Sequence, residues 1–121
     1  MKEKITAVIL FILIIGFVIT NTLVMRYQVG KMIGSIKSLE IRNENAYVNA
    51  SELYEEYTKL QNYISLTVNH EDLTNIEDCF VEMIGYINVD NQKDAEVTKN
   101  RLICSLEHLR RLSGFTLEAI I

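Results

Sequence analysis

The chain has no proline and no tryptophan, and it has only five glycines and two cysteines in 121 residues. Without proline, no helix interior is forced to kink or end. The two cysteines allow at most one disulfide within the chain. After the first 25 residues glycine is sparse, and few stretches alternate β-branched with polar residues. These absences favour an all-α fold.

Charge is missing from one long stretch, which begins at Ile5 and ends at Val24. Fourteen of its residues are Ile, Leu, Val or Phe. A helix of about 20 residues rises roughly 30 Å, the thickness of the hydrocarbon core of a bilayer. At about −0.3 to −0.6 kcal/mol each, the fourteen favour insertion by roughly −4 to −8 kcal/mol. The sequence therefore predicts a membrane anchor over residues 1–25, with residues 5–24 in contact with lipid.

A cleaved signal peptide is the alternative for this segment, because Lys2 and Lys4 supply a basic start. The apolar run is long for that purpose, and no alanine occurs between Ala7 and Ala46 to build a cleavage site. We therefore expect an uncleaved signal-anchor. Basic residues are nearly balanced across the run, but a short tail ahead of the span is typical of a cytoplasmic N-terminus. The prediction is a single-pass cell-membrane protein whose C-terminal domain lies outside the cytoplasm.

Residues 26–121 are enough for one small helical domain. Between Glu40 and Glu96 the charge sums to about −10, whereas residues 26–39 carry +3 and residues 97–121 carry +2. The acidic middle argues against nucleic-acid binding and against a domain lying flat on anionic lipid. It is typical of a solvated helix face, and a docking surface for a basic partner is the alternative.

Apolar residues recur every three or four positions in four stretches, which predicts one buried stripe on each of four helices. We expect a stalk over residues 26–42 that continues the membrane helix, helices over about 46–68, 72–88 and 93–113, and an apolar tail over 114–121. Gly114 is a candidate C-cap. Asn69 is a candidate N-cap, with Thr74 as its competitor. The short connection over residues 88–91 favours antiparallel neighbours, and hence an antiparallel bundle. The four stripes are Met25, Val29, Met32, Ile36 and Leu39; Ala46, Ala50, Leu53, Tyr57, Leu60 and Ile64; Leu73, Ile76, Phe80, Met83, Ile84 and Ile87; and Ala95, Thr98, Leu102, Leu106 and Leu109.

The residues capable of chemistry do not combine into a known motif. Cys79 and Cys104 lie on different faces of their expected helices, so free thiols at the core edge and at the surface are the expectation rather than a disulfide. Cys104 and His108 are four residues apart and could present two metal ligands, but zinc needs three or four. His70 is expected to hold a turn.

The acidic pairs Glu55-Glu56, Glu71-Asp72 and Glu77-Asp78 are neighbours in sequence and point about 100° apart, which is unsuited to acid–base catalysis. Tyrosines at helical positions are expected to pack in the core or at its rim. We predict no catalytic, cofactor-binding or metal-ligating residue, no cofactor and no enzyme activity. The tyrosines concerned are Tyr47, Tyr54, Tyr57, Tyr63 and Tyr86.

Four features together resemble a family of small, uncharacterised bacterial membrane proteins known as domain of unknown function 4363. These are the N-terminal span, the Asn43-Glu44-Asn45 break, the turn from His70 to Ile76, and the ending Leu117-Glu118-Ala119-Ile120. Two positions depart from the family pattern: Ala46 replaces an aromatic residue, and Ala119 replaces an asparagine. The resemblance implies size, fold and topology, and it transfers no catalytic residue.

The sequence thus favours a protein that acts through protein–protein contact, as an accessory or scaffold subunit of a membrane complex. Its expected partners are the bilayer and either another membrane protein or a second copy of itself. The alternative is an extracytoplasmic helical bundle that senses a ligand.

Overall fold

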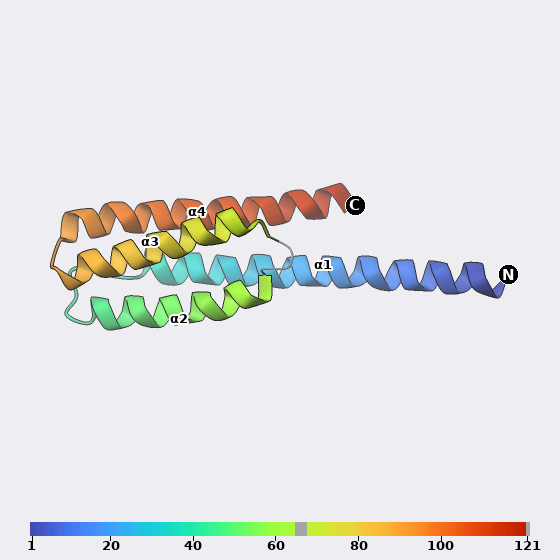
Figure 1. Cartoon of the computed structure of the whole chain (residues 1–121), viewed down its shortest axis with the longest axis horizontal. Helices are drawn as coiled ribbons and strands as arrows, with labels where there is room; N and C mark the ends of the chain where they lie inside the picture. Colours follow the sequence, from blue (N-terminus) through green and yellow to red (C-terminus); the bar gives the residue numbers. More distant parts are fainter. Residues whose placement is uncertain (65–67, 121) are drawn as a thin grey trace.

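The computed structural model describes the backbone of residues 1–64 and 68–120, and the side chains of residues 1–64 and 68–112. Within these ranges the chain forms four helices, α1 (Lys2–Lys37), α2 (Ala46–Ile64), α3 (His70–Asn88) and α4 (Gln92–Ile120), and no strand. Each helix runs antiparallel to the next, and α4 returns alongside α1, which closes a four-helix bundle (Figure 1). The predicted all-α fold with one N-terminal helix leading into an antiparallel bundle is confirmed.

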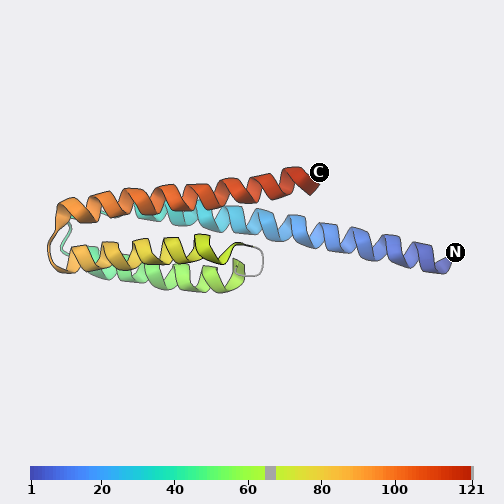
Figure 2. The same cartoon turned by 45° about the horizontal axis from the view of Figure 1, so that its top comes forward.

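Helix α1 has two halves with different surroundings. Its N-terminal part projects beyond the other three helices (Figures 1 and 2), and its large apolar side chains are exposed there, such as Phe11 at 64%. It is long and apolar enough to cross a membrane. Its C-terminal part packs against α2 and α4 and buries Met25, Val29 and Ile36. The predicted stalk over residues 26–42 does continue the membrane helix, but the helix ends at Lys37, and its apolar stripe packs as one of the four bundle helices.

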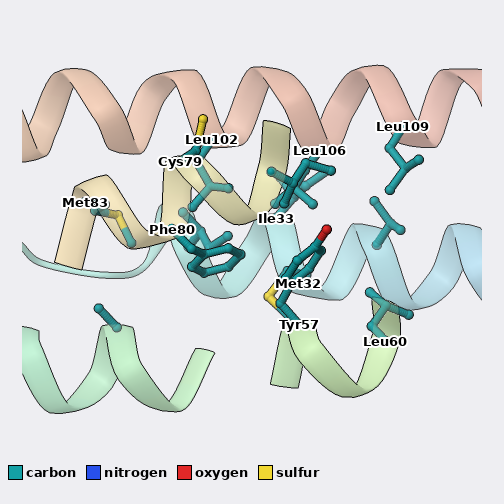
Figure 3. Packing of buried hydrophobic residues seen from close by; sticks show 14 of the residues in the cluster. Met32, Ile33, Tyr57, Leu60, Cys79, Phe80, Met83, Leu102, Leu106 and Leu109 are labelled. Atoms are coloured by element: carbon teal, nitrogen blue, oxygen red, sulfur yellow. The ribbon is translucent and has the colours of Figure 1, made fainter. Parts of the chain in front are cut away.

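The core joins the four predicted stripes, and most of their residues are buried. Leu53, Ile84 and Ile87 are only partly buried at its edge. Helix α4 packs closely on α1 and α3, whereas α2 packs more loosely. Large side chains fill the space beside α2: the Tyr57 ring stacks on Phe80 with ring centres 5.2 Å apart, and Met32 lies nearby (Figure 3). The periodicity therefore predicted the core correctly.

Local hydrogen bonds set the helix boundaries. Asn69 is extended, and its side-chain oxygen accepts from the Glu71 backbone N–H at 3.1 Å, so the predicted N-cap is confirmed and α3 begins at His70 rather than near 72. The competing cap Thr74 is wrong, because its hydroxyl donates to the His70 carbonyl inside the helix. Asn91 accepts from the Asp94 N–H at the start of α4. Asp90 has φ 57°, which gives the short α3–α4 connection its tight turn.

The C-terminal boundary differs from the prediction. Helix α4 continues through Gly114 to Ile120 instead of ending near 113. A glycine inside a helix costs about 1 kcal/mol relative to alanine, but the following Leu117, Glu118 and Ala119 favour helix and no proline follows. The expected packing of the tail side chains falls outside the residues described. Helix α2 is described as far as Ile64, and residue 68, where its end was expected, lies in a bend outside the helix.

The connection between α1 and α2 is held by burial and by a cross-helix hydrogen bond. Leu39 and Ile41 are buried in it although neither is helical. The Lys99 ammonium of α4 donates to the Leu39 carbonyl at 2.6 Å. This bond satisfies a backbone acceptor just after α1 and ties the connection to the opposite helix.

Candidate functional site

A buried polar contact lies between α2 and α3. The Tyr57 hydroxyl is buried and donates to the Leu73 carbonyl oxygen at 2.8 Å. Burial, with the Glu77 carboxylate as a second cause, raises the pKa of Tyr57 well above its ordinary value. The hydroxyl therefore stays protonated and serves as a structural donor.

Tyr54 lies beside this contact at the edge of the core. Its hydroxyl donates to Glu77 Oε1 at 3.3 Å, and its ring meets Phe80 edge-on with centres 5.6 Å apart. Partial burial, followed by the nearby Glu77 charge, raises the pKa of Tyr54. Of the five tyrosines expected at the core or rim, Tyr57 is buried and Tyr54 and Tyr86 are half-buried, whereas Tyr47 and Tyr63 are exposed. The prediction holds for the first three.

A surface groove of about 630 Å³ runs between α3 and α4, and both cysteines line it. Both are free thiols, with Cys79 buried and Cys104 exposed, as the helical positions predicted. Arg101 crosses the groove to Glu82 at 3.2 Å and to Cys79 Sγ at 3.9 Å. Burial raises the pKa of the Cys79 thiol, and the Arg101 charge only partly opposes this effect. A protonated, buried thiol is a poor nucleophile, so Cys79 is a structural rather than a reactive thiol.

The remaining candidate residues do not converge. Glu77 faces α2 through Tyr54, while its neighbour Asp78 lines the groove toward α4, so this acidic pair diverges as its spacing predicts. His70 and His108 are both exposed. In the part of the chain with described side chains, no group of three or more His, Cys, Asp or Glu could hold a metal ion.

A second groove, of about 400 Å³, lies between α1 and α2 where α1 emerges from its apolar run. Sequence reasoning did not identify it, because its residues come from two helices whose relative rotation the chain alone does not reveal. Two lysines and one glutamate are its charged residues, and Gln28 and Tyr63 are its uncharged polar ones. The lining residues are Val24, Gln28, Lys31, Met32, Glu56, Lys59, Leu60 and Tyr63.

Comparison with family models, with curated proteins and with solved structures finds no match to this chain. The resemblance to domain of unknown function 4363 stays a prediction. Function must therefore be argued from the helical architecture, the exposed apolar span and the grooves.

Proposed function

We propose that this chain is a single-span membrane protein that acts through protein–protein contact, as an accessory or scaffold subunit of a membrane complex. The observation that carries the proposal is the continuity of α1, which supplies both the exposed apolar segment and one wall of the bundle. A contact made in the membrane is thereby coupled to the bundle through one unbroken helix.

The chemistry of the described residues supports contact rather than catalysis. The buried hydroxyl of Tyr57 is hydrogen-bonded to a backbone carbonyl, and the buried thiol of Cys79 is held protonated. By contrast, the span exposes apolar side chains all round the helix, including Ile9 at 52% and Phe11 at 64%. This surface can contact lipid on one side and a partner helix on another.

Photo-cross-linking within the membrane tests the proposal. A photoreactive amino acid is placed at Ile9 or at Phe11, which project about 200° apart around the helix, so two opposite faces are sampled. A matched control places it at Val89, which is exposed at the far end of the bundle. We expect one of the two span positions to capture one membrane protein at a near-constant ratio. Capture of this chain alone from every position would contradict the accessory role and favour self-association.

We further propose that the N-terminus lies in the cytoplasm and the bundle outside it. The two free cysteines supply the test, since Cys104 is exposed and Cys79 is buried as an internal control. A membrane-impermeant maleimide should label Cys104 in intact cells and leave Cys79 unlabelled. Labelling that requires opening the membrane would place the bundle in the cytoplasm.

Ligand sensing is the second candidate, and the α1–α2 groove favours it. Lys31 and Lys59 outnumber Glu56 among its charged residues, which suits a small organic anion. A panel of small carboxylates should then raise the melting temperature of the full chain, with the effect lost in Lys59→Gln. An unchanged melting temperature across the panel would leave contact as the function.

A further inference from the structure

The point where α1 leaves its apolar run carries the first charge after Lys4. Arg26 is two residues beyond Val24, or about 3 Å along the helix axis. If residues 5–24 span the hydrocarbon core, this guanidinium lies at the level of the lipid headgroups. Tyr27 follows it with 70% of its surface exposed, at the depth where tyrosine is enriched in membrane proteins.

Helix α4 brings two further arginines to the same level. Figures 1 and 2 show the end of α4 alongside α1, beyond the ends of α2 and α3. Arg110 Nη1 lies 3.9 Å from the position that a Cβ atom on Gly30 would occupy, which places the end of the Arg110 side chain beside α1. Leu23, Arg26, Tyr27, Arg110 and Arg111 together line a hollow of about 400 Å³.

The charge of this hollow is uncompensated among the described side chains. No acidic residue lines it, and no described carboxylate forms an ion pair with any of its three arginines. Elsewhere in the bundle, by contrast, Arg101 pairs with Glu82 and Lys37 with Glu107. Guanidinium groups bind phosphate oxygens through paired hydrogen bonds, and here they are combined with an exposed apolar residue and an exposed aromatic residue.

We propose that this hollow binds the phosphate headgroup of an anionic phospholipid in the leaflet that the bundle faces. Arg26, Arg110 and Arg111 hold the phosphate, while Leu23 and Tyr27 contact the adjoining glycerol and acyl region. The anionic membrane surface repels the acidic middle of the domain, residues 40–96, and this repulsion keeps the rest of the bundle away from the lipid. The proposal rests on the membrane location of α1.

The absence of tryptophan allows a direct test with the full chain. Tyr27→Trp introduces a unique tryptophan at the hollow, and the protein is reconstituted in phosphatidylcholine vesicles that contain phosphatidylglycerol. Either the anionic or the neutral lipid carries brominated acyl chains, at equal mole fraction. We expect stronger quenching of the tryptophan by the brominated anionic lipid.

Charge variants in this background identify the residues responsible. Replacing Arg26, Arg110 and Arg111 by Gln should abolish the preference, with about a fivefold loss of anionic-lipid enrichment per arginine. The matched control is Arg42→Gln with Lys93→Gln, two exposed basic residues outside the hollow. It should retain the preference, and circular dichroism should show unchanged helix content in all variants.

The outcomes separate the headgroup site from the membrane location itself. Equal quenching by both lipids, or a preference that survives the triple substitution, would overturn the headgroup site while leaving the span in place. Equal quenching by both lipids, together with a change of tryptophan emission on addition of inorganic phosphate but not of chloride at equal ionic strength, would assign the hollow to a soluble anion instead. A tryptophan quenched by neither lipid would contradict both this proposal and the membrane location.

Discussion

The hydroxyl of Tyr57 provides the sharpest test of the packing between α2 and α3. It is buried, donates to the Leu73 carbonyl at 2.8 Å, and belongs to a ring stacked on Phe80. Tyr57→Phe keeps the ring and removes only the hydroxyl. Because Leu73 lies within α3, its carbonyl oxygen keeps the hydrogen bond that helix geometry gives it.

At neutral pH, Tyr57→Phe removes one buried hydrogen bond and leaves no backbone group unpaired. The expected loss of stability is therefore the contribution of that one bond. Such a bond contributes about 1 kcal/mol to the free energy of unfolding. We therefore expect Tyr57→Phe to be destabilised by about this amount near neutral pH. The value should be well above that for Tyr47→Phe, because the Tyr47 side chain is exposed.

Alkaline pH should reduce the difference in stability between wild type and Tyr57→Phe. The pKa of Tyr57 is raised above the ordinary value of 10.0, so the folded protein keeps the proton that the unfolded chain releases. The contribution of the Tyr57 hydroxyl to the free energy of unfolding is fully present below pH 10. It decreases by about 1.4 kcal/mol with each further pH unit. Since phenylalanine has no such loss, wild type and Tyr57→Phe should become nearly equal in stability around pH 11.

Urea denaturation of the full chain in a mild detergent, followed by far-ultraviolet circular dichroism, measures both effects. Tyr47→Phe is the control, with no expected change relative to wild type at neutral pH. If wild type exceeds Tyr57→Phe in stability by the same amount at neutral pH and at pH 11, the assignment of a raised Tyr57 pKa is refuted. No advantage at neutral pH would refute the contribution of the hydrogen bond.

Substitutions at three further positions test other parts of the fold by the same denaturation assay. Phe80→Ala should destabilise the bundle by about 3–5 kcal/mol, because the buried ring is in contact with Tyr54 and Tyr57; a loss below 1 kcal/mol would contradict its central position. Asn69→Ala should cost about 1 kcal/mol through loss of the α3 cap, and Asn69→Asp should restore most of it. Asp90→Gly should be neutral or stabilising by up to about 1 kcal/mol, since φ at this position is positive, whereas a marked loss would show that the aspartate side chain matters.

Much of the fold could be predicted because the buried residues recur with helical spacing. The stripe from Ala95 to Leu109 is buried throughout, and the Asn69 cap stands where its sequence signal placed it. The signal at Gly114 failed, because a glycine weakens a helix without ending it when helix-forming residues follow. The continuation of the membrane helix through residues 25–37 was predicted from its stripe, but periodicity does not show which helices cover that apolar face.

Surfaces built from two helices were beyond sequence reasoning. Arg26 and Arg110 are far apart in the chain, and only the antiparallel register of α1 and α4 brings them to one hollow. The α1–α2 groove has the same origin. A stripe predicts burial, whereas the relative rotation and height of helices depend on side-chain packing that single stripes do not encode.

The central claim is that one helix serves both the membrane and the bundle, and a nitroxide scan along α1 tests it most directly. Spin labels are placed one at a time from residue 5 to residue 37 in a Cys79→Ala, Cys104→Ser background reconstituted in vesicles. Residues 5–17 should be accessible to oxygen all round the helix and protected from a water-soluble relaxation agent. From Met25 onward, accessibility should oscillate every 3.6 residues with minima at Met25, Val29 and Ile36. Exposure of residues 5–17 to the water-soluble agent, or no oscillation beyond Met25, would contradict the account.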